Sequence, residues 1–312
     1  MSVMKDLSDG EPSELLTAAQ DFLNYLQVEK GLSENTLSAY RRALIRYLDF
    51  LSESGIDIPE KISKDHLVAF AGRLQDQQAY NLSPRSVCQA FSAVRMFHRV
   101  MVMEGHTDSD PTGVLASPRI TMRLPRALTH EQVEKLLETP SGDDEKGTRD
   151  RLILEMLYGT GMRISEFVGL DLGDLEMSER LVTCRGKGGR WRILPFGMAA
   201  YEVLEAYLKD ARPELAHGSG TPALILNMRG GRLTRQGCWK IIKGHARSAG
   251  MEELVTPHVL RHTFATHLLE GGASLLVVQE LLGHVSVSTT QIYTEVTRDH
   301  LMDVYRRTHP RA

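Results

Sequence analysis

A stretch of helix-breaking residues over 106–126 divides the sequence into two helical parts. Prolines, glycines, aspartates and serines recur along this stretch and disrupt any helical or strand periodicity. With 312 residues, the chain is long enough to form two apolar cores. We therefore expect one domain over 12–105, a basic linker over 106–124, a second domain over 125–306 and a tail over 307–312.

The N-terminal part has the pattern of four amphipathic helices. Apolar residues recur at helical spacing over 15–26 and again over 37–51, which predicts the first two helices. Residues typical of helix starts are Ser33 for the second helix, Ser63 for the third, and Ser83 followed by Pro84 for the fourth. This part carries no cluster of residues typical of catalysis, so on sequence alone it is a scaffold.

The C-terminal part is predicted to be mostly helical with one short excursion into β-structure. The capping-box sequence over 129–132 starts a helix. Residues 181–184 and 191–194 have strand character and flank the glycine-rich turn 186–189, which predicts a hairpin. The expected fold class is therefore mainly α with a small β-hairpin, in two domains.

The positive charge of the chain is clustered, although its net charge is −3. A slightly acidic balance by itself argues against a nucleic-acid partner, but DNA responds to the local field of one face. Three basic runs, 81–103, 185–192 and 229–247, contain no acidic residue. One such run is most simply a solvated surface, whereas three together favour a binding surface. The candidate DNA contacts in these runs are Arg95, Arg99, Arg235, Lys240 and Lys243.

Several classes of protein and site are excluded by missing patterns. No run approaches the ~18 apolar residues of a membrane span, and the N-terminus lacks the apolar core of a secretory signal. His258 and His262 have the spacing of zinc ligands on a helix, but Val259 stands where the HExxH motif needs glutamate. Neither a P-loop nor a nucleophile elbow is present. The three cysteines form neither a disulfide framework nor a zinc site. We expect a cytoplasmic protein without metal, cofactor or membrane partner.

What remains is a set of cationic and proton-transferring residues with one tyrosine. Arg163 follows a glycine-rich turn, and Glu166 lies one helical turn along, where it can hold the guanidinium. Singly, each member is more simply a surface ion pair, a satisfied polar residue or ordinary packing. In chain order, the set is Arg163, Lys187, His258, Arg261, His284 and Tyr293.

In this order the set resembles the tyrosine recombinase family of the lambda-integrase type. The strings that resemble its Xer branch are Gly-Thr-Gly-Met-Arg-Ile-Ser-Glu at 159–166, His-Val-Leu-Arg-His-Thr-Phe-Ala-Thr-His at 258–267, Leu-Leu-Gly-His at 281–284 and Thr-Thr-Gln-Ile-Tyr at 289–293. The resemblance covers nearly the whole chain, and no catalytic position is missing. It implies that 12–105 is a DNA-binding core-binding domain and 125–306 the catalytic domain, and that the two clamp duplex DNA.

The resemblance also implies a mechanism in which a tyrosine forms a 3′-phosphotyrosyl bond with DNA. Without a metal, fixed donors must stabilise the transition state, and the planar fork of arginine matches phosphate oxygens. The covalent bond retains the energy of the phosphodiester, so no ATP is required. The implied roles are Tyr293 as nucleophile, Arg163 and Arg261 with His284 as phosphate-stabilising groups, His258 as base and Lys187 as acid.

The biological role implied by the resemblance is recombination of a specific DNA site by a tetramer. The chain would act with itself or with a second recombinase to resolve chromosome dimers at cell division, with a septal DNA translocase as a further partner. Three alternatives remain open: a phage or mobile-element integrase, a nicking-closing topoisomerase, and a non-catalytic DNA-binding regulator. The stripe Leu301, Val304 and Tyr305 predicts a C-terminal helix, which either docks on a neighbouring subunit, as family tails do, or covers its own core.

Overall fold

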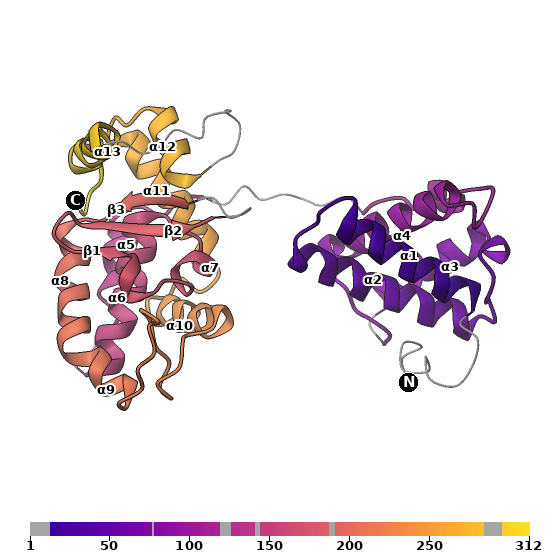
Figure 1. The fold of residues 1–312 in the computed structure, drawn as a ribbon, viewed down its shortest axis with the longest axis horizontal. Helices are drawn as coiled ribbons and strands as arrows, with labels where there is room; N and C mark the ends of the chain where they lie inside the picture. The colour runs from indigo at the N-terminus through magenta and orange to yellow at the C-terminus, as the bar shows by residue number, and fades with distance from the viewer. Residues whose placement is uncertain (1–12, 77, 119–125, 141–143, 187–190, 284–294) are drawn as a thin grey trace. The chain divides into compact units, whose positions relative to one another are not determined.

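The chain folds into two compact units, residues 1–123 and 124–312 (Figure 1). The computed structural model describes residues 13–76, 78–118, 126–140, 144–186, 191–283 and 295–312. Over these residues the fold is mainly helical with a small antiparallel sheet, which confirms the predicted fold class. Within the same residues, no helix is both long and apolar enough to cross a membrane.

The first unit packs its helices around an aromatic core. Phe22, Tyr47, Phe70 and Phe97 are buried, and the rings of Phe22 and Phe97 meet edge to face with centroids 5.5 Å apart. The helices of this unit are α1 (Glu14–Val28), α2 (Glu34–Glu53), α3 (Lys64–Gln75) and α4 (Pro84–Met103), with short 3-10 turns at Pro59–Lys61 and Pro111–Val114.

The predicted helix starts of the first unit are confirmed, with one difference in detail. The side chains of Ser63 and Ser83 accept hydrogen bonds from backbone N–H groups in the first turns of α3 and α4. Ser33 also occupies the N-cap position of α2, but its hydroxyl lies 2.9 Å from the hydroxyl of Thr36. The hydroxyl of Ser33 therefore bonds to the side chain of Thr36 and not to a backbone N–H of the first turn.

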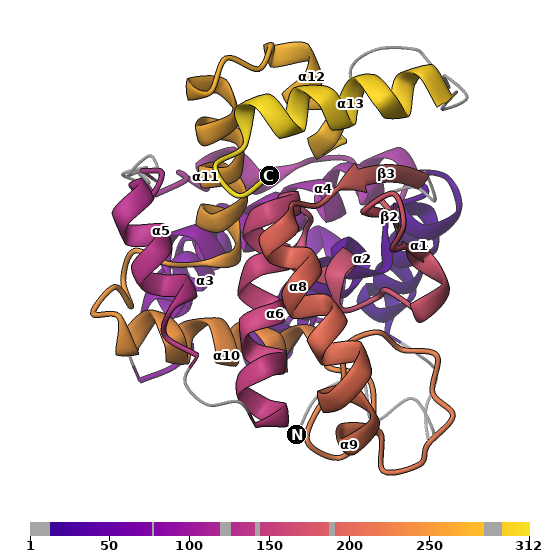
Figure 2. The same ribbon diagram turned by 90° about the vertical axis from the view of Figure 1, so that its left-hand side faces the viewer.

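The second unit is organised around α6 (Glu145–Thr160), which packs against α5, α8, α10 and α11 (Figure 2). All of α6 from Leu152 to Thr160 is buried, so this helix is surrounded on every side and forms the centre of the core. The other helices are α5 (His130–Leu137), α7 (Ile164–Phe167), α8 (Met198–Ala206), α9 (Arg212–Ala216), α10 (Arg235–Ser248), α11 (Pro257–Glu270), α12 (Leu275–Leu282) and α13 (Glu295–Thr308), with a 3-10 turn at Leu172–Asp174 and a π turn at Tyr207–Ala211.

The sheet of the second unit contains the predicted hairpin and a strand that was not predicted. Strands β2 (Leu181–Arg185) and β3 (Trp191–Pro195) pair antiparallel, with Cys184 opposite Arg192 in the register. The two-residue strand β1 (Leu175–Glu176) adds to β2, giving the order β1-β2-β3. Strand β3 packs against both α12 and α13, so the hairpin forms part of the core.

Helix α13 covers the core of its own unit in this structure. Leu301 and Tyr305 are buried, and the hydroxyl of Tyr305 donates to the carbonyl of Gly159 at 2.9 Å. Beyond the helix, the guanidinium of Arg311 pairs with the buried carboxylate of Glu155 on α6. Of the two predicted arrangements, the structure therefore contains the one in which the helix packs on its own domain.

Candidate active site

The site begins at a tight turn between α6 and α7 that only glycine can make. Gly161 has a φ of +60° and caps α6 in the left-handed conformation. A Cβ atom at this position would lie 2.3 Å from the ring of Phe264 on α11. The turn therefore combines left-handed backbone with close packing, and it sets Arg163 at the first position before α7.

Arg163 and Arg192 share the carboxylate of Glu166. Nη1 of Arg163 donates to Oε1 of Glu166 at 2.8 Å, which confirms the predicted pair. Arg192 binds the same carboxylate with two further bonds, of 2.9 Å to Oε1 and 2.7 Å to Oε2. The side chain of Arg163 is 38% exposed, whereas those of Glu166 and Arg192 are only 4% and 7% exposed. Arg163 is thus the member of the trio that reaches the surface.

The carboxylate of Glu166 is held in its charged form. Burial raises the pKa of this group, but the bonds and charges of Arg192, followed by those of Arg163, outweigh it and lower the pKa to about 2. The backbone N–H of Arg163 donates to Oε2 at 2.6 Å and adds to this effect. Glu166 is therefore an anion at every physiological pH and serves as the common anchor of two cations.

Arg261 on α11 is a third guanidinium beside this pair. Its Nη1 donates to the carbonyl of Gly161 at 2.7 Å, and its Nη2 donates to the carbonyl of Leu282 at the end of α12. Burial, and then the charges of Arg163 and Arg192, lower its pKa to about 10. Three guanidiniums therefore lie close enough together for their charges to repel one another.

Of the predicted catalytic residues, the structure describes Arg163, His258 and Arg261. His258 is exposed in the first turn of α11, three residues before Arg261, so the expected shared helix face is present. Lys187, His284 and Tyr293 lie outside the described residues.

The candidate DNA contacts are not equivalent. Arg99, Arg235 and Lys240 are exposed. Arg95 instead donates to the carbonyl of Leu115 and, at 3.5 Å, to the hydroxyl of Ser117. The ammonium of Lys243 donates to the carbonyl of Glu252 and lies 3.4 Å from that of Val255. Arg95 and Lys243 therefore already bind their own chain, which no local pattern in the sequence indicated.

The basic run 229–247 also acquires acidic partners from elsewhere. Arg232 pairs with Asp171 and donates to the carbonyls of Val168 and Leu170. Arg247 pairs with Glu252. The absence of acids within a run of sequence thus overstated the free positive charge of this surface.

Arg192 is a site residue that the sequence did not single out. It lies in the basic run 185–192 and in a predicted strand, where a solvated position is the ordinary expectation. Its burial depends on Glu166, 26 positions earlier, and on the carbonyl of Leu281, 89 positions later. The available signal was its spacing from Leu194, since residues two positions apart in a strand share one face and Leu194 is apolar.

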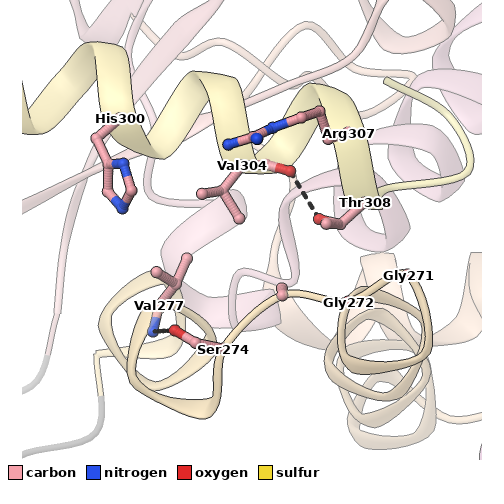
Figure 3. A pocket seen from close by; sticks show the side chains of 9 residues that line it. Gly271, Gly272, Ser274, Val277, His300, Val304, Arg307 and Thr308 are labelled. Carbon is pink, nitrogen blue, oxygen red and sulfur yellow. Dashed lines mark hydrogen bonds between the residues drawn. The ribbon is translucent and has the colours of Figure 1, made fainter.

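Two other features of the second unit are separate from these arginines. A hollow of about 370 Å³ lies between the turn after α11 and helix α13. Figure 3 shows residues that line it, among them Ser274, Val277, His300 and Arg307. None of the described candidate catalytic residues lines it. His130, His267 and Glu270 lie close enough to hold a metal ion, but both ring nitrogens of His267 are already hydrogen-bonded.

The second unit thus combines a helical fold and a small sheet with a cluster of three guanidiniums around Glu166. Residues 126–300 match the phage integrase family, and residues 19–105 match the N-terminal SAM-like domain of phage integrases. Tyrosine recombinase XerD of Mycobacterium tuberculosis is 47% identical over 302 residues, covering 94% of this chain and 97% of the relative. Tyrosine recombinase XerD of Halalkalibacterium halodurans is 43% identical over 294 residues, with 94% and 97% covered.

Solved structures share the fold at lower identity. The XerH site-specific recombinase bound to its difH substrate is 19% identical with a TM-score of 0.69, covering 95% of this chain and 94% of that one. A lambda integrase tetramer bound to a Holliday junction is 19% identical with a TM-score of 0.64, covering 93% and 83%. The chain belongs to the phage integrase family and is a tyrosine recombinase, an enzyme that cuts and rejoins DNA strands.

Proposed function

We propose that Arg163 and Arg261 hold the phosphate at which this recombinase cuts DNA. The observation that carries the proposal is their convergence: Arg261 binds the carbonyl of Gly161, 100 positions away, in the turn that presents Arg163. Two preorganised guanidiniums can stabilise the charge that spreads over the equatorial oxygens during phosphoryl transfer. Because three guanidiniums lie around the single carboxylate of Glu166, the cluster keeps a net positive charge for the DNA.

The remaining roles complete the reaction. Tyr293 attacks the phosphate and forms the 3′-phosphotyrosyl bond, while the 5′ oxygen of the DNA leaves. A tyrosine is protonated at neutral pH, so a base is needed, and His258 is exposed close to Arg261 in sequence and on the same helix. Lys187 gives the proton to the leaving oxygen, and His284 adds a donor to the phosphate. A second tyrosine, Tyr305, is unsuited to attack because it is buried and bonded to Gly159.

The DNA-bound relatives support a wider proposal about assembly. We propose that residues 12–105 and 125–306, joined by the linker 106–124, clamp duplex DNA, with 307–312 as a tail. The solved relatives include a recombinase on its site and an integrase tetramer on a Holliday junction. By the same arrangement, this chain acts in a tetramer at one specific site, with itself or a second recombinase.

The curated relatives named XerD support a role in resolving chromosome dimers. We place this activity in the cytoplasm at cell division, with a septal DNA translocase as an activating partner. No ligand other than DNA is required by the proposal.

Covalent capture tests both the chemistry and the site. Fragments of the host chromosome are incubated with the protein, and those that remain bound after denaturation are sequenced. We expect one short site, cut by the wild type but not by Tyr293→Phe, with DNA binding by the variant nearly unchanged. Tyr305→Phe, which removes a structural hydroxyl, should still form the adduct. Adducts that persist in Tyr293→Phe, or capture spread over random sequence, would refute the assignment.

A further inference from the structure

We infer that Arg192 is a positioning residue that leaves the charge of Arg163 free for the DNA phosphate and fixes the catalytic segments to one another. The inference rests on the proposed function, because it concerns how Arg163 acts on the scissile phosphate. Arg192 itself is buried, so it acts through its neighbours and not by touching DNA.

A single carboxylate is divided unequally between two arginines. Arg192 makes a two-point contact with Glu166, with one guanidinium nitrogen on each carboxylate oxygen. Arg163 makes a one-point side-chain contact with the same group. Arg192 therefore takes the larger share of Glu166, and the half-buried Arg163 is only partly neutralised by its own contact with this carboxylate. Without Arg192, the buried carboxylate would have Arg163 as its main partner and would cancel the charge that the phosphate needs.

The third donor of Arg192 connects two elements of the site. Its Nε donates to the carbonyl of Leu281 at 3.1 Å, so the guanidinium ties β3 to the last turn of α12. A Cβ atom on Gly283 would lie only 3.3 Å from Cδ and Nη1 of Arg192, which shows how closely the backbone passes over the side chain. Because Gly283 directly precedes His284, Arg192 fixes the described backbone from which that residue departs.

The same residue is anchored in the hairpin. Arg192 pairs with Cys184 in the β2–β3 register, and the turn between these strands contains Lys187 in the sequence. One side chain thus joins the strand pair that carries the proposed acid, the carboxylate that anchors Arg163, and the helix end that precedes His284. Only arginine has donors in a planar fork for all of these contacts, since lysine offers a single ammonium.

The test uses four variants and a nicked duplex that carries the site recovered by covalent capture. Arg192→Met removes the charge at similar length, Arg192→Lys keeps the charge, and Arg192→Met/Glu166→Gln removes both charges. Arg212→Met is the matched control, because Arg212 is also a structural arginine, bonded to the carbonyls of Thr221 and Ala223. Cleavage rate at saturating DNA, DNA affinity and thermal unfolding are measured for each.

We expect Arg192→Met to slow cleavage by about 10²-fold, in the range seen for loss of one preorganised donor, with DNA affinity little changed. The double variant should cleave at least about 10-fold faster than Arg192→Met, since Glu166 no longer cancels Arg163. The cleavage rate of Arg192→Lys should lie between those of Arg192→Met and the wild type. Arg212→Met should cleave like the wild type. If the double variant is no faster than Arg192→Met, Glu166 does not compete for Arg163 and the inference is wrong.

A neutral substrate separates a charge effect from a loss of fold. A methyl group in place of one non-bridging oxygen makes the scissile phosphate uncharged, so it gains less from the charge of Arg163. The defect of Arg192→Met should shrink on this methylphosphonate duplex, whereas a misfolded site would be equally slow on both substrates. If Arg192→Met does not fold, the double variant carries the test, and it must then cleave within about 10-fold of the rate of the wild-type protein. If the wild type itself forms no adduct, it is the proposed function that fails.

Discussion

The hydroxyl of Tyr158 lies 2.8 Å from Nδ1 of His267, which joins α6 to α11 inside the second unit. The other ring nitrogen of His267 lies 2.9 Å from the carbonyl of Leu128 and must carry a hydrogen to bond there. Nδ1 of the neutral ring is therefore the acceptor for the tyrosine. Burial, and then the nearby His130, lower the pKa of His267, which favours this neutral form.

Removing the hydroxyl of Tyr158 should destabilise the second unit without changing the residues proposed to act in DNA cleavage. Tyr158→Phe leaves Nδ1 of His267 buried without its donor, so the free energy of unfolding should fall by about 1–3 kcal/mol. Denaturant unfolding measures this change. Tyr201→Phe is the control, since Tyr201 bonds to Glu205 on an exposed surface, and it should change stability little. An equal decrease in both variants would show that the buried bond has no special value.

The turn at Gly161 should tolerate no side chain. Gly161→Ala adds left-handed strain and a contact with Phe264, so unfolding should become easier by about 2–5 kcal/mol. Cleavage should fall as well, because the carbonyl of Gly161 is a partner of Arg261. Gly105 has a similarly positive φ of +76° but open space around it, so Gly105→Ala isolates the strain, at ~1–2 kcal/mol. A cleavage rate unchanged by Gly161→Ala would contradict the proposed link.

The buried carboxylate should make the second unit sensitive to acid. The pKa of Glu166 is lowered to about 2 in the folded protein from an ordinary 4.5, so its contribution is present above pH 4.5 and is lost as pH falls toward 2. This difference in pKa corresponds to roughly 3 kcal/mol of the free energy of unfolding. Unfolding free energies measured from pH 6 downward should fall less steeply in Arg192→Met/Glu166→Gln than in the wild type. Glu252→Gln removes a carboxylate whose pKa Arg247 also lowers, but in a solvent-screened ion pair, so it should flatten the slope much less.

Two lysines three positions apart on α10 should behave differently. Lys240 is exposed, so Lys240→Ala should weaken DNA binding across sequences and flatten its salt dependence by about 0.9 log units for each phosphate that is no longer neutralised. Lys243 binds two backbone carbonyls, so Lys243→Ala should lower stability more than affinity. Filter binding over a salt series, with thermal unfolding in parallel, distinguishes the two. The reverse pattern would show that the exposed lysine does not bind DNA.

Sulfur substitution should separate the proposed acid from the phosphate-binding arginine. A 5′ sulfur at the cut site leaves without a proton, so this substrate should restore cleavage by Lys187→Ala. It should not restore Arg163→Ala, which is expected to cleave ~10²–10³-fold more slowly because a preorganised donor is gone. Single-turnover cleavage of oxygen and sulfur duplexes gives both comparisons. Rescue of both variants, or of neither, would mean that Lys187 is not the acid.

Local sequence signals predicted most of the fold, whereas contacts between residues far apart in the sequence could not be predicted. The N-caps Ser63 and Ser83 and the hairpin are visible because a cap or a strand pair depends on neighbouring residues. The strand β1 has two residues and no pattern of its own. The Arg163–Glu166 pair lies three positions apart and was predictable, but the partners of Arg192 and Lys243 come from other segments.

The packing of Tyr305 against Gly159 sets an order of events during synthesis of the protein. The first unit has a core of its own, so it can fold as soon as it leaves the ribosome. The core beneath the turn that carries Arg163 closes only when α13, the last described helix, has been made. A nascent chain can therefore complete the core of its first unit before that of the second unit, so the proposed cleavage activity is gained last.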